Sequence, residues 1–182
     1  GIRTAAAKKL SAEIRQALED LNFGQVRFDI EVRQTGNITP DGADEAEFMI
    51  SVNPGEDLRP LAKIASGGEL SRIMLGIKSV LANKDDTDTL IFDEIDTGIS
   101  GRTAQKVSEK MALIARSHQV ICITHLPQIA AMADIHFLIE KNIKDGFTTT
   151  SINRLSDREI ITELARMLGG SQITDLVMDN AA

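Results

Sequence analysis

The sequence predicts an α/β fold in which a mainly parallel sheet is flanked by helices. Two short apolar runs, Leu90 to Phe92 and Val120 to Ile123, are typical of strands covered on both faces, and a helical pattern separates them. A strand, a helix and a second strand in this order favour parallel neighbours in one sheet. Alternating apolar residues elsewhere predict additional antiparallel strands.

Composition limits the classes of protein that fit. With 182 residues, 42% of them hydrophobic, the chain can bury one good core, which favours a single globular domain with an appended helix. One cysteine, Cys122, excludes a disulfide framework, and its apolar neighbours make it an expected core residue. The lack of a signal-peptide pattern or a long apolar run leads us to expect a cytoplasmic protein without a membrane partner. A net charge of -7 argues against binding nucleic acid through charge alone.

The first elements are predicted to be a helix and an antiparallel pair of strands. Ala5 to Asn22 carries apolar residues at helical spacing, with Thr4 as a possible cap and Gly24 as a breaker. The apolar positions of this helix are Leu10, Ile14, Leu18 and Leu21. Val26 to Val32 and Phe48 to Val52 then alternate between apolar and polar residues, so we expect them to pair with each other.

An irregular stretch, Asn53 to Ala65, leads into Ser66-Gly67-Gly68-Glu69 and a helix that ends near Ala82. The face of this helix predicted to be buried carries Leu70, Met74, Ile77 and Leu81. A capping box of Ser66 and Glu69 accounts for both residues without any ligand. The capping box does not account for Gly67 and Gly68. Glycines at these positions let a ligand approach the backbone N–H groups closely, and a helix N-terminus attracts anions.

The stretch Thr89 to Ser100 is a short strand that runs into two adjacent carboxylates, Asp93 and Glu94. Two acids after a strand are more often solvated turn residues than a site. Because successive strand side chains point to opposite faces, however, one carboxylate could hold a metal ion while the other faces a water molecule. In open α/β sheets, chemistry collects at the carboxyl ends of such strands.

Ser100 is a plausible N-cap for a helix that runs through Ser117. Its apolar positions are Ala104, Val107, Met111 and Ile114. The second apolar strand ends at Thr124-His125, which places His125 on the same sheet edge as the acids. A lone histidine after a strand is more often a capped or solvated residue than a catalytic one, and only its position beside the acids raises its interest.

The rest of the chain is predicted to hold a short helix, a hairpin and a last helix. These span Pro127 to Ala133, Ile135 to Ile152 around Asp145-Gly146, and Ser156 to Leu168. Ser156 and Glu159 are spaced as a capping box, and Gly169 is the expected C-cap.

In their order and spacing, four motifs resemble those of ABC-type ATPases, and within that family the SMC-like ATPases of bacterial DNA double-strand-break repair. Ser66 to Leu70 resembles the signature motif, Leu90 to Glu94 the Walker B strand, Asp96 to Ser100 the D-loop, and Thr124-His125 the switch histidine. Each motif alone is weak, whereas four together are highly specific. The similarity extends from about Arg3 to Gly170.

The resemblance implies that the chain is the C-terminal lobe of an ATPase head. Residues 1–22 would end a returning coiled-coil helix, residues 23–170 would form the lobe, and residues 171–182 would be a tail. No phosphate-binding Gly-x-x-x-x-Gly-Lys-Ser/Thr loop occurs, because Gly76-Ile77-Lys78-Ser79 lacks the Gly-Lys pair and lies in a helix. That loop would come from the N-terminal lobe of the same protein, so the isolated chain is expected to be inactive.

The resemblance also implies ATP and Mg²⁺ as cofactors, a second head as a homodimer partner, and DNA bound through the full-length, nucleoid-associated protein. Asp93 would help to hold Mg²⁺, Glu94 would polarise the attacking water, and His125 would contact the γ-phosphate. Nucleotide contacts across the dimer would come from Ser66, Gly67, Gly68 and Glu69, and the D-loop residues are Asp96, Thr97, Gly98 and Ser100. Ser100 stands where many D-loops carry Asp, which leaves its role between subunits open.

The function implied is ATP-dependent dimerisation and hydrolysis by paired heads in DNA repair and recombination. A rival hypothesis is a non-catalytic module that keeps the surface only to dimerise or dock. Glu94 and His125 are dispensable in such a module, so their presence argues against it. Another coiled-coil ABC ATPase, such as an SMC head, is the third alternative.

Overall fold

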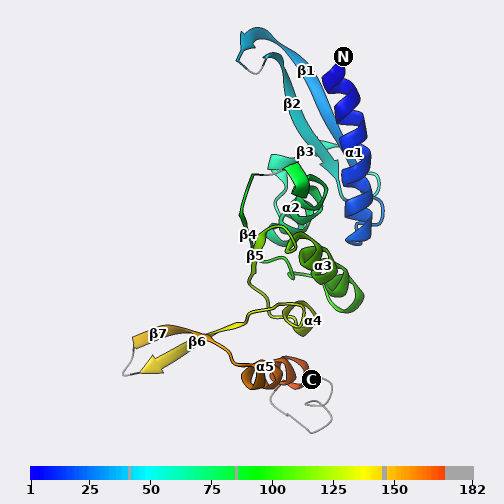
Figure 1. Ribbon diagram of the computed structural model, residues 1–182. Helices are drawn as coiled ribbons and strands as arrows, with labels where there is room; N and C mark the ends of the chain where they lie inside the picture. Colours follow the sequence, from blue (N-terminus) through cyan, green and yellow to red (C-terminus); the bar gives the residue numbers. More distant parts are fainter. Residues whose placement is uncertain (41, 85, 145–146, 171–182) are drawn as a thin grey trace. The chain divides into compact units, whose positions relative to one another are not determined.

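The computed structural model describes residues 1–40, 42–84, 86–144 and 147–170. Internal contacts divide the chain into two compact units, and the boundary lies between Ile123 and Thr124. The first unit contains the N-terminal helix, a long antiparallel hairpin and a parallel strand pair, and the second contains another hairpin and the last helix (Figure 1).

Helix α1 (Ile2–Asp20) has the predicted amphipathic character, and Ile14, Leu18 and the following Leu21 are almost completely buried. The prediction that Thr4 caps it is wrong. The helix already begins at Ile2, and the Thr4 hydroxyl lies within it, 3.5 Å from the Gly1 amino group. The chain leaves the helix before Gly24, because Asn22 adopts a left-handed conformation with φ 70°.

Strands β1 (Arg27–Thr39) and β2 (Gly42–Ser51) pair antiparallel as predicted, with Phe28 opposite Ile50. A two-residue strand, β3 (Arg59–Pro60), adds to β2, and a 3₁₀ turn, η1 (Leu61–Lys63), follows within the stretch expected to be irregular. The hairpin runs alongside α1 (Figure 1). Together with α2 they enclose a core of Ala7, Ile14, Leu18, Val26, Phe28, Ile30, Ile50, Ile73 and Ile77.

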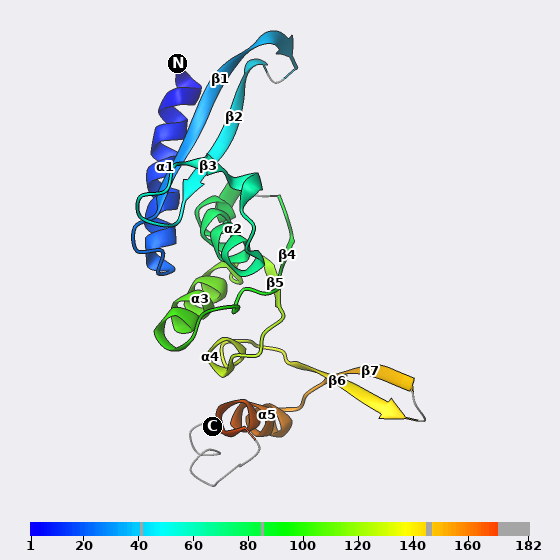
Figure 2. The ribbon, with the colours of Figure 1, turned by 180° about the vertical axis from the view of Figure 1, so that it is seen from behind.

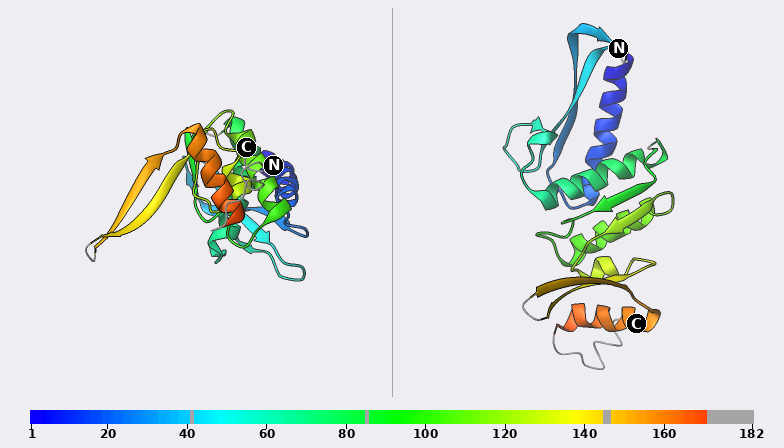
Figure 3. Two further views of the ribbon diagram at one scale, coloured as in Figure 1. Left: turned by 90° about the horizontal axis from the view of Figure 1, so that it is seen from below. Right: turned by 90° about the vertical axis from the view of Figure 1, so that its left-hand side faces the viewer.

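Helix α2 (Gly67–Leu81) begins after Ser66 as predicted, but its buried face was predicted only in part. Ile77 is buried, whereas Leu70, Met74 and Leu81 are only partly covered. The buried positions also include Gly68, Arg72, Ile73, Leu75 and Gly76. The reason is that α2 is covered from more than one side. It crosses the end of α1 (Figure 3), and a Cβ on Gly76 would lie 2.8 Å from Leu18 Cδ2. A 3₁₀ turn, η2 (Ala82–Lys84), ends the segment.

Strand β4 (Thr89–Phe92), helix α3 (Gly101–Ile114) and strand β5 (Gln119–Cys122) form the predicted parallel βαβ unit, with Leu90 opposite Val120. All four predicted apolar positions of α3, which are Ala104, Val107, Met111 and Ile114, are buried. Figure 2 shows α3 beside this strand pair. The helix ends at Ile114 rather than Ser117, and Ser100 is its N-cap without a side-chain hydrogen bond.

One face of the β4–β5 pair is open, which differs from the prediction that both faces are covered. Leu90 and Phe92 are buried, but Ile91 between them is 67% exposed. On β5 and just beyond it, Ile121 and Ile123 are 44% and 49% exposed. Cys122 is half-buried rather than a core residue, and burial raises the pKa of its thiol to about 12, so it stays protonated at neutral pH.

The second unit contains α4 (Pro127–Ala130), the antiparallel pair β6 (Phe137–Lys144) and β7 (Phe147–Arg154), and α5 (Asp157–Gly169). The hairpin is confirmed, while its predicted turn residues, Asp145-Gly146, and the tail at 171–182 lie outside the described residues.

Helix α5 has the predicted capping box. The Ser156 N–H donates to Glu159 Oε2 at 2.8 Å, and the bonds from Ser156 lower the pKa of the Glu159 carboxyl. Its C-cap is Gly170, with φ 64°, one residue later than predicted. None of the helices in the described ranges is both long and apolar enough to cross a membrane.

Candidate functional site

The acidic residues lie in a tight turn rather than on a strand. Strand β4 ends at Phe92, and Glu94 takes a left-handed conformation with φ 56°. The Thr97 N–H donates to the Glu94 carbonyl at 3.0 Å, and the Ile99 N–H donates to the Asp96 carbonyl at 3.3 Å. The alternation of a strand therefore does not orient the two carboxylates. The turn orients them, and non-glycine residues rarely adopt such a conformation outside constrained sites.

Residues 93–100 are referred to below as the acidic turn. Ile95 and Asp96 are buried, at 0% and 4% exposure, and anchor the turn in the unit. Asp93 and Glu94 are exposed, and so are Thr97, Gly98 and Ser100, three of the residues predicted to form a D-loop. The sequence motif thus folds into an anchored turn with two accessible carboxylates at its start.

Asp93 is held by two hydrogen bonds that fix its orientation. Its Oδ1 accepts from the Glu94 N–H at 2.8 Å, and its backbone carbonyl accepts from the Ser71 hydroxyl at 2.6 Å. Ser71 belongs to α2, so the helix that begins after Ser66 also supports the first acid. The other carboxylate oxygen of Asp93 makes no hydrogen bond within the described residues and remains accessible.

Ser66 is the N-cap of α2, as predicted, and its Oγ accepts from the Glu69 N–H at 3.4 Å. The predicted capping box is only half formed: in the described chain no bond runs from the Ser66 amide to the Glu69 carboxylate. The Glu69 charge acts instead on the guanidinium of Arg72. Ser66 and Gly67 are exposed at the start of the helix.

Gly67 and Gly68 allow the acidic turn to approach the start of α2. A Cβ on Gly68 would lie 2.9 Å from Thr97 Cβ and 3.0 Å from the Glu94 carbonyl oxygen, so only glycine fits there without a shift of backbone. A Cβ on Gly67 would overlap the Glu94 carboxylate oxygen Oε2. Within this chain, the group that approaches the helix N-terminus is thus the carboxylate of Glu94.

Arg72 joins α2 to the same turn, and sequence reasoning missed it. It is 8% exposed, and its Nη1 donates to the carbonyl oxygens of Ile95 at 3.2 Å and Thr97 at 2.8 Å. Burial lowers the pKa of its guanidinium, while the Glu69 and Asp96 carboxylates oppose that shift. The sequence pattern carried no signal for it, because Arg72 lies away from the helix face of Leu70, Met74 and Ile77 that was predicted to be buried.

His125 is exposed and belongs to the second unit, which begins at Thr124, so its predicted role stays a prediction. No group of three or more His, Cys, Asp or Glu side chains forms a metal site in the described ranges. Mg²⁺ commonly keeps several waters and binds one or two carboxylates together with substrate phosphates. The accessible carboxylate of Asp93 fits that kind of site.

Comparison with known proteins gives consistent relatives, although no family model matches the chain. DNA repair protein RecN of Bacillus subtilis is 45% identical over 99% of this chain and 34% of its own length. RecN of Vibrio cholerae is also 45% identical, over 98% of this chain and 32% of its own. The chain therefore spans about a third of these curated relatives.

Solved structures share the fold. An Smc head domain with a coiled coil and joint from Pyrococcus yayanosii has a TM-score of 0.62 at 18% identity, over 94% of this chain and 30% of that one. An Smc head domain from Pyrococcus furiosus, bound to the C-terminal domain of ScpA, has a TM-score of 0.56 at 21% identity. The match covers 91% of this chain and 39% of that one. At these identities the likeness establishes the fold of an SMC head fragment.

The two glycines generate the first prediction. Gly68→Ala should lower the free energy of unfolding by about 1–3 kcal/mol, because its Cβ meets backbone and Thr97, which cannot move easily. Gly67→Ala is the matched control, since its Cβ meets only the end of a flexible glutamate. Urea unfolding followed by circular dichroism suits a chain without Trp or Tyr. Equal losses in the two variants would contradict the proposed packing of the turn against Gly68.

Proposed function

The chain is RecN-like along its whole length, and on that premise we propose that it is the C-terminal lobe of an ATPase head that hydrolyses ATP between two facing heads. One observation carries the proposal: the start of α2 and the acidic turn are packed into one piece through Gly68, Ser71 and Arg72. Such a piece presents a helix N-terminus, which favours a phosphate, beside a fixed turn that carries two exposed carboxylates. In this proposal residues 1–22 end a returning coiled-coil arm, residues 23–170 form the lobe and residues 171–182 are a tail.

Glu94 is proposed as the general base. Its carboxylate is exposed, and the left-handed turn holds the backbone that carries it. It would accept a proton from the attacking water, and His125 would contact the γ-phosphate. Asp93 would hold Mg²⁺ through its accessible oxygen, and the bound ion would neutralise charge on the phosphates.

Ser66 and the N–H groups of Gly67, Gly68 and Glu69 are proposed to contact the γ-phosphate of ATP carried by the opposite head. A helix N-terminus favours negative charge, and charge develops on the transferred phosphoryl group. The sequence has no phosphate-cradling loop, so the nucleotide must be carried by another lobe. Binding of ATP would then hold two heads together, and hydrolysis would release them.

The N-terminal lobe of the same protein is the proposed partner for the open face of the β4–β5 pair. Exposed isoleucines on a parallel sheet are unusual, since such sheets are normally covered on both faces. The relatives are about three times as long as this chain, so a covering segment is available in them. Without that segment, the isolated chain is expected neither to bind nor to hydrolyse ATP.

The relatives are named as DNA repair proteins, so the proposed cycle of head association would control how the full-length protein holds DNA at double-strand breaks. DNA contacts would lie mainly outside this chain, given its net charge of -7. A purely docking role is the weaker alternative. A surface used only for docking does not require two exposed carboxylates on a turn that Ser71 and Arg72 hold in place.

The open sheet face generates a second prediction. When this chain is co-expressed with the remaining N-terminal part of the protein, the two should copurify and bind ATP, and Ile121→Glu should weaken their association at least about tenfold. The reason is that a carboxylate would be buried without a partner. Leu113→Glu on α3, at a similarly exposed position, is the matched control. Unchanged ATP binding and copurification of Ile121→Glu would refute the proposed contact.

The third prediction concerns Glu94 in the complete protein. Glu94→Gln should keep ATP binding while turnover falls by about 10²- to 10⁴-fold, because the amide keeps the shape but cannot accept a proton. ATP-bound dimers should then accumulate, as measured by light scattering. Glu109→Gln, an exposed position on α3, serves as the control. Near-normal turnover in Glu94→Gln, or a failure to dimerise with ATP, would remove Glu94 from its proposed role.

A further inference from the structure

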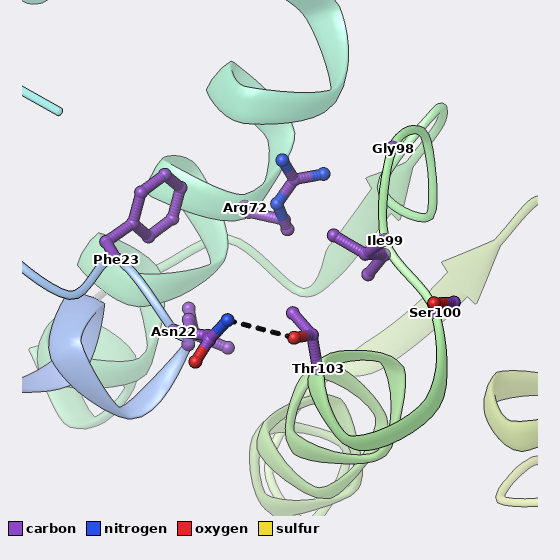
Figure 4. A pocket seen from close by; sticks show the side chains of 8 residues that line it. Asn22, Phe23, Arg72, Gly98, Ile99, Ser100 and Thr103 are labelled. Carbon is purple, nitrogen blue, oxygen red and sulfur yellow. Dashed lines mark hydrogen bonds between the residues drawn. The ribbon is translucent and has the colours of Figure 1, made fainter. Parts of the chain in front are cut away.

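The end of α1 lies beside the acidic turn across a cavity of about 250 Å³ (Figure 4). The lining residues come from the α1–β1 connection, α2, the acidic turn and the start of α3. Two described interactions span it. The Asn22 side-chain amide donates to the Thr103 hydroxyl at 3.1 Å, and the Arg72 guanidinium carbon lies 5.8 Å from the centre of the Phe23 ring.

Of the four residues in these two interactions, Arg72 is the one that contacts both the acidic turn and the α1–β1 connection. One nitrogen donates to two carbonyls, those of Ile95 and Thr97, which flank the buried Asp96. Removing the donor would leave the buried carbonyl oxygen of Ile95 and the partly buried one of Thr97 without it, which is costly. The geometry of the turn that begins with Glu94 therefore depends on where the guanidinium sits.

The guanidinium in turn depends on α1. Phe23 lies three residues after Asp20, the last residue of this helix, and its ring supports the guanidinium in a cation–π contact. Asn22 fixes the connection from the other side, through its left-handed backbone and its bond to Thr103. A shift of α1 would move Phe23, and with it the support of Arg72. The adjacent cavity leaves room for such a shift.

We propose that Arg72 is a positioning residue that couples the end of α1 to the acidic turn. Through Phe23, the position of α1 sets how firmly the Ile95 and Thr97 carbonyls are held, and hence where the turn presents Glu94. The inference rests on the proposed ATPase function for its consequence, which is that the arm containing α1 regulates hydrolysis. The coupling itself concerns only contacts within the first unit.

The test uses the full-length protein with Phe23→Leu and Arg72→Lys. Phe23→Leu keeps an apolar side chain but removes the ring, and Arg72→Lys keeps the charge but loses the planar fork. Hydrogen exchange measured by mass spectrometry should be at least about tenfold faster at the Thr97 and Ile99 amides in both variants. For ATP hydrolysis, kcat should fall by about 10- to 100-fold with little change in KM. Phe147→Leu and Arg116→Lys, both at exposed positions, are the matched controls.

The decisive variant is Phe23→Leu, because Phe23 has no described contact with the acidic turn. If its exchange at Thr97 and Ile99 and its kcat match the wild type, Arg72 is only a local support and the coupling is refuted. If Arg72→Lys fails to fold, Phe23→Leu still decides. If wild-type protein hydrolyses no ATP, the proposed function fails, while the exchange rates continue to test the coupling by themselves.

Discussion

The structure depends on the close approach of the acidic turn to the start of α2. At Gly68 the absence of a side chain lets the Glu94 carbonyl and Thr97 pack directly against the helix. Ser71 and Arg72, on the next turn of the same helix, then bond to three carbonyls of the 93–97 segment. Because these contacts join the helix N-terminus to the carboxylates, neither motif can be displaced without the other. Residues 66–70 and the two acids, Asp93 and Glu94, are therefore one structural object.

The packing also explains the glycines without a bound anion. Gly67 and Gly68 have no side chains, so the acidic turn can pack against the start of α2. The same lack of side chains exposes their backbone N–H groups. The Glu94 carboxylate lies where a side chain at position 67 would be, beside the start of α2. In the proposed dimer, the arrival of a nucleotide on the opposite head would require this flexible side chain to rotate toward its own site.

Local pattern predicted much of the fold. The buried positions of α3, the parallel β4–β5 pair and both antiparallel hairpins follow from periodicity that a short window contains. The buried side of α2 does not, because α1 and the acidic turn cover it from different directions, and neither is visible in the spacing of Leu70 and Met74. The left-handed Glu94 and the buried Arg72 are likewise products of tertiary contact. The open face of β4–β5 could not be predicted from the run of apolar residues, since what covers such a face need not lie in the same chain segment.

The proposed dimer depends on the action of Ser66 across the interface, on a nucleotide attended by Asp93 and Glu94 of the other head. Its most direct test is to mix complete heads carrying Ser66→Ala with complete heads carrying Glu94→Gln, each nearly inactive alone. In a mixed dimer, action in trans places both defects in one site and leaves the other intact, so ATP turnover should recover. Loss of the Ser66 cap costs only about 1 kcal/mol, and thermal melts would show that the variant is folded. If mixed dimers form, as verified by native mass spectrometry, and no turnover returns, the trans-acting role of Ser66 is contradicted.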